Sequence, residues 1–292
     1  MNISASTLYL NDNDRGCPEK YLRMMAEAGF SHVMWCFHWR DDFLYSTHEI
    51  AAYKKMMTSC GLTMLDIHGT AGDEKCWFSM DEYCRKAGVE LVENRMVMLA
   101  EMESQGVLTL HVPCYCAEWV APEDQVRMRP MGDALKRSIA ELLPSMEKYN
   151  VKIALENSGG DSFQLLSECM REFPAEYVGI TFDAGHANLF GATGFERIKP
   201  WKDRIYAIHL HDNDGNGDWH QPPFFGNVKW EEFFRFLKNS SYRNVLNFEF
   251  TMKNTPLYIP ELREKQPEDK VKIFLADAYA RCRKAVELYN TL

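Results

Sequence analysis

The chain has 292 residues, 46% of them hydrophobic, and this length allows either one large core or two smaller ones. Its formal charge of −9 disfavours a broad attraction to phosphate backbones, so we do not expect nucleic acid as a partner. No apolar run approaches the roughly 18 residues of a membrane span, and residues 1–6 lack the basic start of an export signal.

Nine cysteines occur at irregular spacings. Without an export signal, this pattern is typical of a reducing compartment, where thiols behave as small buried hydrophobic groups. We therefore expect a cytoplasmic protein. Cys114 and Cys116 are spaced closely enough to share a soft metal ion, but no second pair lies near them, and we assign them no role.

Short apolar segments alternate with longer amphipathic stretches along the whole chain. The eight segments that predict strands are 3–10, 31–37, 63–67, 107–112, 152–155, 178–182, 205–210 and 245–250. Between them, apolar residues recur at helical spacing, as in 135–146 and again in 271–286. No Pro-, Gly- or Ser-rich linker divides the chain. The sequence thus predicts a single-domain (β/α)8 TIM barrel over residues 1–292.

Three long loops are expected after strands, at 113–132, 211–228 and 251–268. Aromatic residues in them could stack on a substrate or pack between the loops, and both interpretations stay open. These residues are Trp119, Trp219, Phe224, Phe225 and Tyr258.

Six successive predicted strands run directly into side chains that can bind metal ions or transfer protons. They are Asp66, His68, His111, Glu156, Asp183, His186, His209, His211 and Glu249. Any one of them is more often a structural residue, but all strand ends of a parallel barrel meet at one rim. His32, His38 and His48 lack this placement, so we expect them to be structural or exposed.

Three of these acids need a cation if they are buried together. A divalent metal ion would neutralise Glu156, Asp183 and Glu249, and His209 can supply a neutral ligand. This ligand set suits one Mn²⁺, Mg²⁺ or Co²⁺ ion, whereas additional histidines would favour Zn²⁺. Asp66 is expected to accept a hydrogen bond from His68 or from another ligand.

The strand-end motifs resemble those of the xylose isomerase-like TIM-barrel superfamily, which holds sugar isomerases, ketose 3-epimerases, inosose dehydratases and endonuclease IV. The resemblance covers nearly the whole chain, and its most specific parts are residues 155–157, 181–186, 209–214, 218–220 and 247–249. It implies that Glu156, Asp183, His209 and Glu249 bind one metal ion and that a ketose-like sugar is the substrate. The two glutamates would then exchange a proton through an enediolate. The remaining candidates are assigned to substrate binding: His68, His111, His186, Asp218 and His220.

Two other activities stay open. A lyase that dehydrates a keto-sugar or keto-polyol would use the same proton abstraction. Endonuclease IV binds three zinc ions through residues that all have counterparts here, but residues 210–214 and 222–230 differ from the nuclease and the acidic charge opposes DNA binding.

Within this resemblance, Asp218 and His220 have three open roles: a second metal site, substrate contact or loop ordering. A silent sugar-binding protein is disfavoured because all four ligands are retained. Residues 157–160 could cradle a phosphate or only turn the chain. Phosphorylated and free sugars, and a homo-oligomer, also stay open.

Overall fold

Parallel strands form the centre of the computed structural model, which describes residues 1–10, 18–70, 72, 74–113, 122–158, 162–189, 191–263 and 265–292. Within these ranges there are eight strands: β1 (Ser4–Ser6), β2 (His32–Trp35), β3 (Thr63–His68), β4 (Leu108–Leu110), β5 (Ile153–Glu156), β6 (Val178–Asp183), β7 (Ile205–His209) and β8 (Asn247–Phe248). All eight overlap the predicted segments.

The strands are hydrogen-bonded in the order β7-β6-β5-β4-β3-β2-β1-β8. Between the two ends of this order, a parallel bridge joins Leu210 to Phe248. Leu210 N donates to Asn247 O at 3.0 Å, and Glu249 N donates to Leu210 O at 3.0 Å. These contacts close the ring just beyond β7, which makes the sheet a barrel and confirms the predicted fold class.

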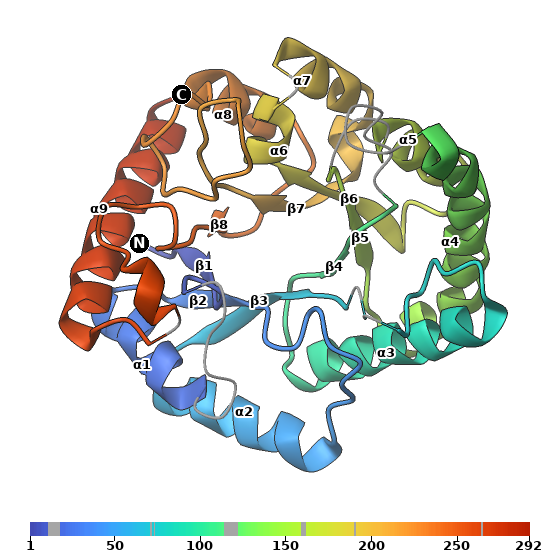
Figure 1. The fold of residues 1–292 in the computed structure, drawn as a ribbon, viewed down its shortest axis with the longest axis horizontal. Coiled ribbons are helices and arrows are strands. Elements are labelled where there is room, and N and C mark those ends of the chain that lie inside the picture. Colours follow the sequence, from blue (N-terminus) through green and yellow to red (C-terminus); the bar gives the residue numbers. More distant parts are fainter. Residues whose placement is uncertain are drawn as a thin grey trace.

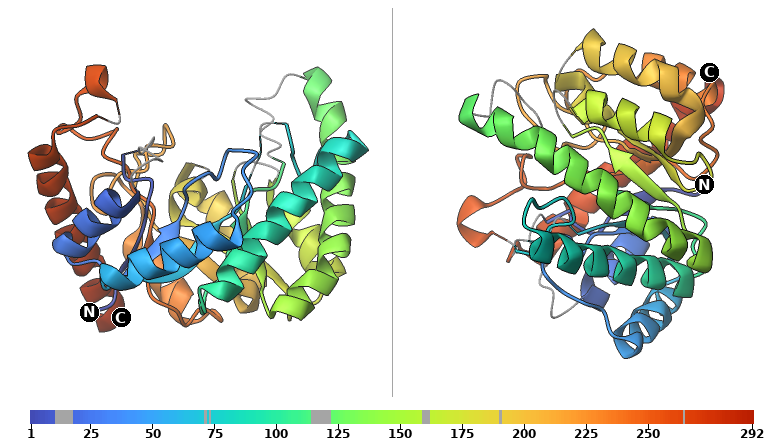
Figure 2. Two further views of the ribbon diagram at one scale, coloured as in Figure 1. Left: turned by 90° about the horizontal axis from the view of Figure 1, so that it is seen from below. Right: turned by 90° about the vertical axis from the view of Figure 1, so that its right-hand side faces the viewer.

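Helices surround the barrel and follow the strands in turn (Figures 1 and 2). They are α1 (Pro18–Ala28), α2 (Thr47–Ser59), α3 (Glu82–Glu101), α4 (Pro122–Tyr149), α5 (Ser162–Glu172), α6 (Ala184–Leu189), α7 (Ala192–Ile198), α8 (Trp230–Lys238) and α9 (Glu268–Thr291), with short 3₁₀ helices η1 (Lys199–Arg204) and η2 (Pro260–Leu262). The apolar positions predicted in α9 are buried against the barrel, from Val271 to Val286.

One predicted loop is wrong in part. Residues 122–132 belong to α4, although Pro130 and Gly132 lie among them. Pro122 begins the helix, where its missing N–H is not needed. Farther along, Leu135 and Ile139 are completely buried, so packing of this face outweighs the helix-breaking residues.

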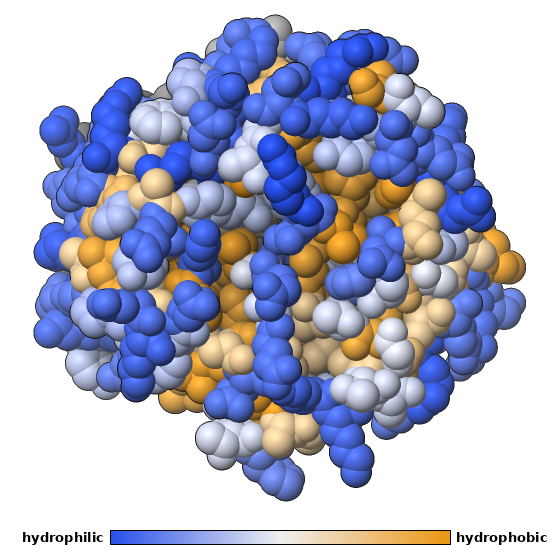
Figure 3. Space-filling model, turned by 180° about the vertical axis from the view of Figure 1, so that it is seen from behind, coloured by the Kyte–Doolittle hydropathy of each residue, from blue (hydrophilic) through white to orange (hydrophobic). Residues whose placement is uncertain are grey.

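The carboxyl ends of the strands lie on the face toward the viewer in Figure 1, and both chain termini lie at the other end of the barrel (Figure 2). Figure 3 shows that other end, where apolar side chains are visible between polar ones. Among the described helices, none has the length and apolar character required to cross a bilayer. The polar strand-end residues all belong to the opposite, carboxyl-end face.

Candidate functional site

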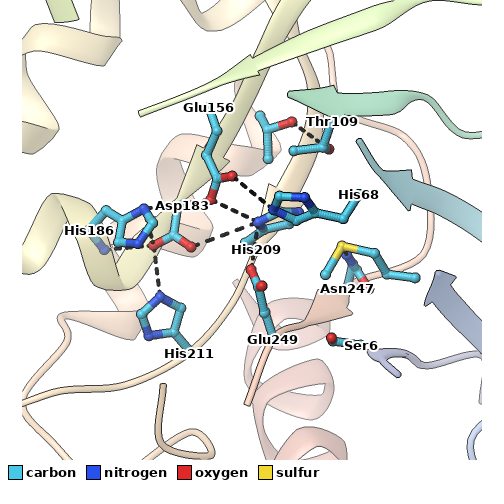
Figure 4. A network of polar contacts seen from close by, with 12 residues as sticks. Ser6, His68, Thr109, Glu156, Asp183, His186, His209, His211, Asn247 and Glu249 are labelled. Carbon is cyan, nitrogen blue, oxygen red and sulfur yellow. Dashed lines mark hydrogen bonds and ion pairs between the residues drawn. The ribbon is translucent and has the colours of Figure 1, made fainter. Parts of the chain in front are cut away.

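Five buried polar side chains stand at the carboxyl ends of the strands and converge on one point (Figure 4). His68 ends β3, Glu156 ends β5, Asp183 ends β6, His209 ends β7 and Glu249 follows β8 directly. None is more than 8% exposed. The barrel therefore gathers residues that are up to 181 positions apart, since 249 − 68 = 181.

Three carboxylates surround the imidazole of His209. Its Nδ1 lies 2.9 Å from Glu156 Oε1, 2.7 Å from Glu249 Oε2 and 3.9 Å from Asp183 Oδ2. One potential ligand atom from each of these four residues lies within 4.8 Å of the other three. We call them the Glu–Asp–His–Glu cluster. Its donor set suits a divalent cation.

Several atoms of this cluster are buried without a hydrogen bond in the described part of the chain. They are Glu156 Oε2, Asp183 Oδ2, Glu249 Oε2 and His209 Nε2; the 2.7 Å contact between Glu249 Oε2 and His209 Nδ1 is an ion pair without hydrogen-bond geometry. A carboxylate oxygen that is removed from water and accepts no hydrogen bond is costly, unless a cation compensates it. The residues present therefore fit a metal ion.

The charges of the cluster favour a proton on His209. Burial alone would lower the pKa of His209, but the charges of Glu156 and Glu249 outweigh burial and raise it well above its usual value. Conversely, burial would raise the pKa of both glutamates, whereas the positive His209 holds them below their ordinary range. A divalent cation would supply the same compensation, so it competes with this proton.

His68 and His111 lie on the other side of Glu156. Their Nε2 atoms are 3.6 Å and 3.2 Å from Glu156 Oε2. The indole of Trp39 packs against both imidazoles, with ring centroids 4.9 Å from His68 and 5.3 Å from His111. Trp39 comes from the loop after β2 and forms one wall of the site.

A second group of metal-type side chains adjoins the first, and we call it the histidine–Asp218 cluster. It consists of His186, His211, Asp218 and His220, which also offer ligand atoms within 4.8 Å of one another. Asp218 Oδ2 lies 3.3 Å from His186 Nε2 and 3.1 Å from His220 Nε2. His211 Nε2 lies 3.0 Å from Asp183 Oδ1 and so connects the two clusters.

Asp218 is the charge that organises the histidine–Asp218 cluster. Burial lowers the pKa of His220, but the hydrogen bond to Asp218 outweighs burial and raises it to about 9. Burial likewise lowers the pKa of His186, while Asp183 and Asp218 raise it well above its usual value. The contact expected for loop ordering is thus present, and the same donors could serve a second cation or a substrate.

A buried carboxylate holds the loop that carries Asp218 and His220. Asp212 Oδ1 accepts hydrogen bonds from Asn213 N and Val228 N, and Asp212 Oδ2 accepts from Phe224 N and the indole of Trp230. Asp212 is completely buried, so these four bonds tie both ends of the loop to one point.

A cavity of about 320 Å³ opens above the two clusters. It is lined by Ser6, Leu8, Trp39, Arg40, His68, His111, Glu156, His186, Asp218, His220, Glu249, Phe250, Thr251, Lys253 and Asn254. All five residues predicted to bind substrate therefore line one cavity together with both predicted catalytic glutamates. Its volume lies at the small end of ligand pockets, which favours a small substrate.

Residues 22–273 match the family described as xylose isomerase-like TIM barrel. The chain belongs to this family. The resemblance inferred from the strand-end motifs is thereby confirmed.

Relatives in sequence and structure agree with this membership. The uncharacterised protein y4fM of Sinorhizobium fredii is 25% identical over 253 residues, which is 79% of this chain and 80% of that protein. The crystal structure of a D-tagatose 3-epimerase-like protein superimposes with a TM-score of 0.71 at 23% identity and covers 100% of this chain and 99% of its own. The D-psicose 3-epimerase of Clostridium cellulolyticum, solved with D-tagatose, has a TM-score of 0.72 at 14% identity and covers 98% and 99%.

The sequence assigns no specific role to two residues of this site. His211 lies at a predicted strand end, and its position two residues after His209 is the signal in the sequence that places it near the site. Trp39 lies in a loop that no motif marks, so only the fold places it beside His68 and His111.

Some expectations from sequence are wrong or lie outside the described residues. Asp66 does not bond to His68; its Oδ1 accepts from Val107 N at 2.8 Å, deeper in the barrel. For the loop aromatics, stacking on a substrate and packing between loops were both open; Trp219, Phe224, Phe225 and Tyr258 do not line the cavity, and Phe225 packs under the guanidinium of Arg281, as the second alternative expects. Outside the described residues are Trp119, Cys114, Cys116, Gly159 and Gly160.

The remaining histidines lie away from the cavity. His48 is exposed, and His32 contacts the Ser31 hydroxyl at 2.9 Å. His38 stacks on Phe43 with ring centroids 4.1 Å apart. Their placement agrees with the structural or exposed roles expected for them.

Proposed function

We propose that this protein is a metal-dependent isomerase or epimerase of a small ketose-like sugar. The observation that carries the proposal is the Glu–Asp–His–Glu cluster, which contains buried unsatisfied oxygens and contributes Glu156 and Glu249 to the lining of a small cavity. Glu156, Asp183, His209 and Glu249 would hold one divalent ion, Mn²⁺, Mg²⁺, Co²⁺ or Zn²⁺. The bound ion would stabilise negative charge on a substrate carbonyl oxygen during enediolate formation.

Glu156 and Glu249 are the proposed acid and base. They approach His209 from different strands, β5 and the end of β8, and both line the cavity. One carboxylate removes a proton from a carbon next to the carbonyl, and the other returns a proton to the enediolate. Return on the opposite face inverts the carbon, whereas return to the neighbouring carbon moves the carbonyl.

The histidines and Asp218 would bind the substrate hydroxyl groups. His186 and His220 share Asp218, which favours their charged, donating forms. His68 and His111 present nitrogen atoms beside Glu156. The cavity thus offers several hydrogen-bonding groups on two sides of the proposed reacting carbons, as a polyhydroxylated substrate requires.

The test is a screen of free and phosphorylated ketoses with the Mn²⁺-loaded protein, followed by chromatography and by NMR of solvent deuterium incorporation. Glu156→Gln and Glu249→Gln should each abolish turnover while leaving the circular dichroism spectrum unchanged. Glu90→Gln, an exposed position on α3, is the matched control and should retain full activity. Absence of both turnover and deuterium exchange with every ketose would refute the proposal.

A lyase would share the first step. Proton abstraction followed by loss of a β-hydroxyl group gives an enone, which absorbs in the ultraviolet. The same screen therefore separates the two reactions: an isomer without new absorbance supports the isomerase or epimerase, and an absorbing product with release of water supports a dehydratase.

A second candidate is metal-dependent phosphodiester cleavage, and the histidine–Asp218 cluster is the observation that favours it. Together with the adjacent His68 and His111, this cluster contains side chains that could bind more than one ion. Metal analysis of the zinc-reconstituted protein tests this reading. About three zinc ions per chain with nicking of abasic DNA would support it, and one ion without nicking would exclude it.

A further inference from the structure

The cavity has an acidic floor and a cationic edge. Three carboxylates line it, from Glu156, Asp218 and Glu249, and Asp183 adjoins them in the Glu–Asp–His–Glu cluster. Only two lysine or arginine residues line it in the part of the chain that the structure describes, Arg40 and Lys253. These two come from the loops after β2 and β8, which are the neighbours of β1 in the barrel. The positive charges therefore lie on one side of the mouth.

Arg40 is held in place by its own loop. Its guanidinium carbon lies 4.3 Å from the centroid of the Trp39 ring, which itself packs on His68 and His111. A cation stacked on an indole that forms the cavity wall is pre-positioned toward the same cavity. No described acidic side chain forms an ion pair with Arg40.

A buried arginine fixes the backbone around Trp39 and Arg40. Arg95 is 1% exposed and donates to the carbonyl oxygens of His38, at 3.2 Å, and of Phe43. His38 has a positive φ of 59°, a conformation that is costly for a residue with a side chain. The clamp from Arg95 maintains this turn, so the loop presents Arg40 in one geometry.

Backbone contacts likewise hold the loop of Lys253. Thr251 N donates to His220 O at 2.7 Å, and Met252 N donates to Tyr9 O at 2.7 Å. Lys253 N donates to the hydroxyl of Thr251 at 3.2 Å. The side chain is exposed and makes no ion pair with a described residue, so its charge is available to a ligand.

We propose that the substrate is an anionic sugar derivative, whose phosphate or carboxylate group binds Arg40 and Lys253 while its reacting carbons lie over the Glu–Asp–His–Glu cluster. The identification of the ligand as a sugar rests on the proposed function, whereas the anion site itself depends only on the cavity. A neutral sugar would leave both cations without an ion-pair partner among the described residues, at the mouth of an acidic cavity. An anionic group at the end of the substrate that is distant from the reacting carbons pairs with the two cations and avoids repulsion by the carboxylates.

Calorimetric binding to the Mn²⁺-loaded protein tests the inference with a readout that does not depend on turnover. The probes are D-fructose, D-fructose 6-phosphate and 5-keto-D-gluconate, each at low and high salt. We expect at least one anionic probe to bind about tenfold more tightly than D-fructose and to weaken with salt. Tighter binding of the phosphate identifies a sugar phosphate, and tighter binding of the carboxylate identifies a sugar acid.

Variants locate the anion. Arg40→Gln and Lys253→Gln should each weaken the anionic probe about tenfold and change D-fructose affinity less than twofold. Lys55→Gln, an exposed position on α2, removes the same charge and should change neither. Equal affinities for all three probes, or variants that bind the anions as well as the parent, would overturn the inference.

The outcomes for the inference and for the proposed function are separable. Turnover of neutral ketoses without any effect of Arg40→Gln or Lys253→Gln leaves the isomerase or epimerase standing and removes the anion site. Arg40- and Lys253-dependent anion binding without turnover of any ketose keeps the anion site and removes the proposed reaction.

Discussion

The buried carboxylate of Asp66 allows a quantitative prediction of how much a buried charge lowers the free energy of unfolding. It is 1% exposed on β3, and one hydrogen bond from Val107 N supports its carboxylate at 2.8 Å. Burial raises the pKa of Asp66 from 3.8 to about 6, more than the Val107 hydrogen bond lowers it. A shift of about two units corresponds to about 3 kcal/mol, because each unit is about 1.36 kcal/mol.

The sign follows from proton binding. The folded protein holds the Asp66 proton more tightly than the unfolded chain, so its contribution to stability is present below pH 3.8 and is lost as the pH rises to about 6. Asp66→Asn keeps an oxygen that can accept from Val107 and removes the charge. We expect this variant to be more stable than the parent at neutral pH by up to about 3 kcal/mol.

Urea unfolding of the chelator-treated protein at pH 5 and pH 7.5 measures the effect. Between these pH values the advantage of Asp66→Asn should grow by about 1.4 kcal/mol, since the cost rises by 1.36 kcal/mol per unit up to a folded pKa of about 6. Asp203→Asn, at an exposed position of η1, is the control and should show no such growth. A variant less stable than the parent at pH 7.5, or an advantage independent of pH, would refute the reasoning.

Three further predictions follow from the site. Mn²⁺ affinity should increase with pH, because the ion displaces the proton that His209 retains through its raised pKa. Calorimetric titration in buffers of different ionisation enthalpy should detect the released proton, and the absence of proton release would contradict this competition. Asp212→Asn replaces a carboxylate that accepts four hydrogen bonds by an amide, and urea unfolding should show a loss of about 1–3 kcal/mol for each donor that is left unsatisfied. Unchanged stability would show that the loop does not depend on this carboxylate. Gly185→Ala would place a Cβ 2.0 Å from His211 Cε1, and the overpacking should cost about 1–3 kcal/mol in thermal unfolding; an unchanged melting temperature would mean that His211 moves freely.

Much of the architecture was predictable because it depends on local pattern. The eight strands are short and mostly buried on both faces, as in β6, where all residues from Val178 to Asp183 are buried. Amphipathic spacing in α9 likewise identified the residues that face the barrel. The start of α4 is not predicted from sequence, because Pro130 and Gly132 indicate a break in the helix. Only the long-range packing of its buried face makes this segment helical.

The sequence by itself determined the alternation of strands and helices and the placement of acids and histidines where the strands end. Only the tertiary structure decided which of these polar residues meet. Asp66 and His68 belong to the same strand, yet Asp66 lies deeper and accepts a hydrogen bond from Val107 N, whereas His68 lies beside Glu156. His211, Trp39 and the cationic edge of Arg40 and Lys253 likewise depend on barrel closure. The physical reason is that the distances between these side chains are determined by strand pairing around the ring, and separation along the chain carries no information about them.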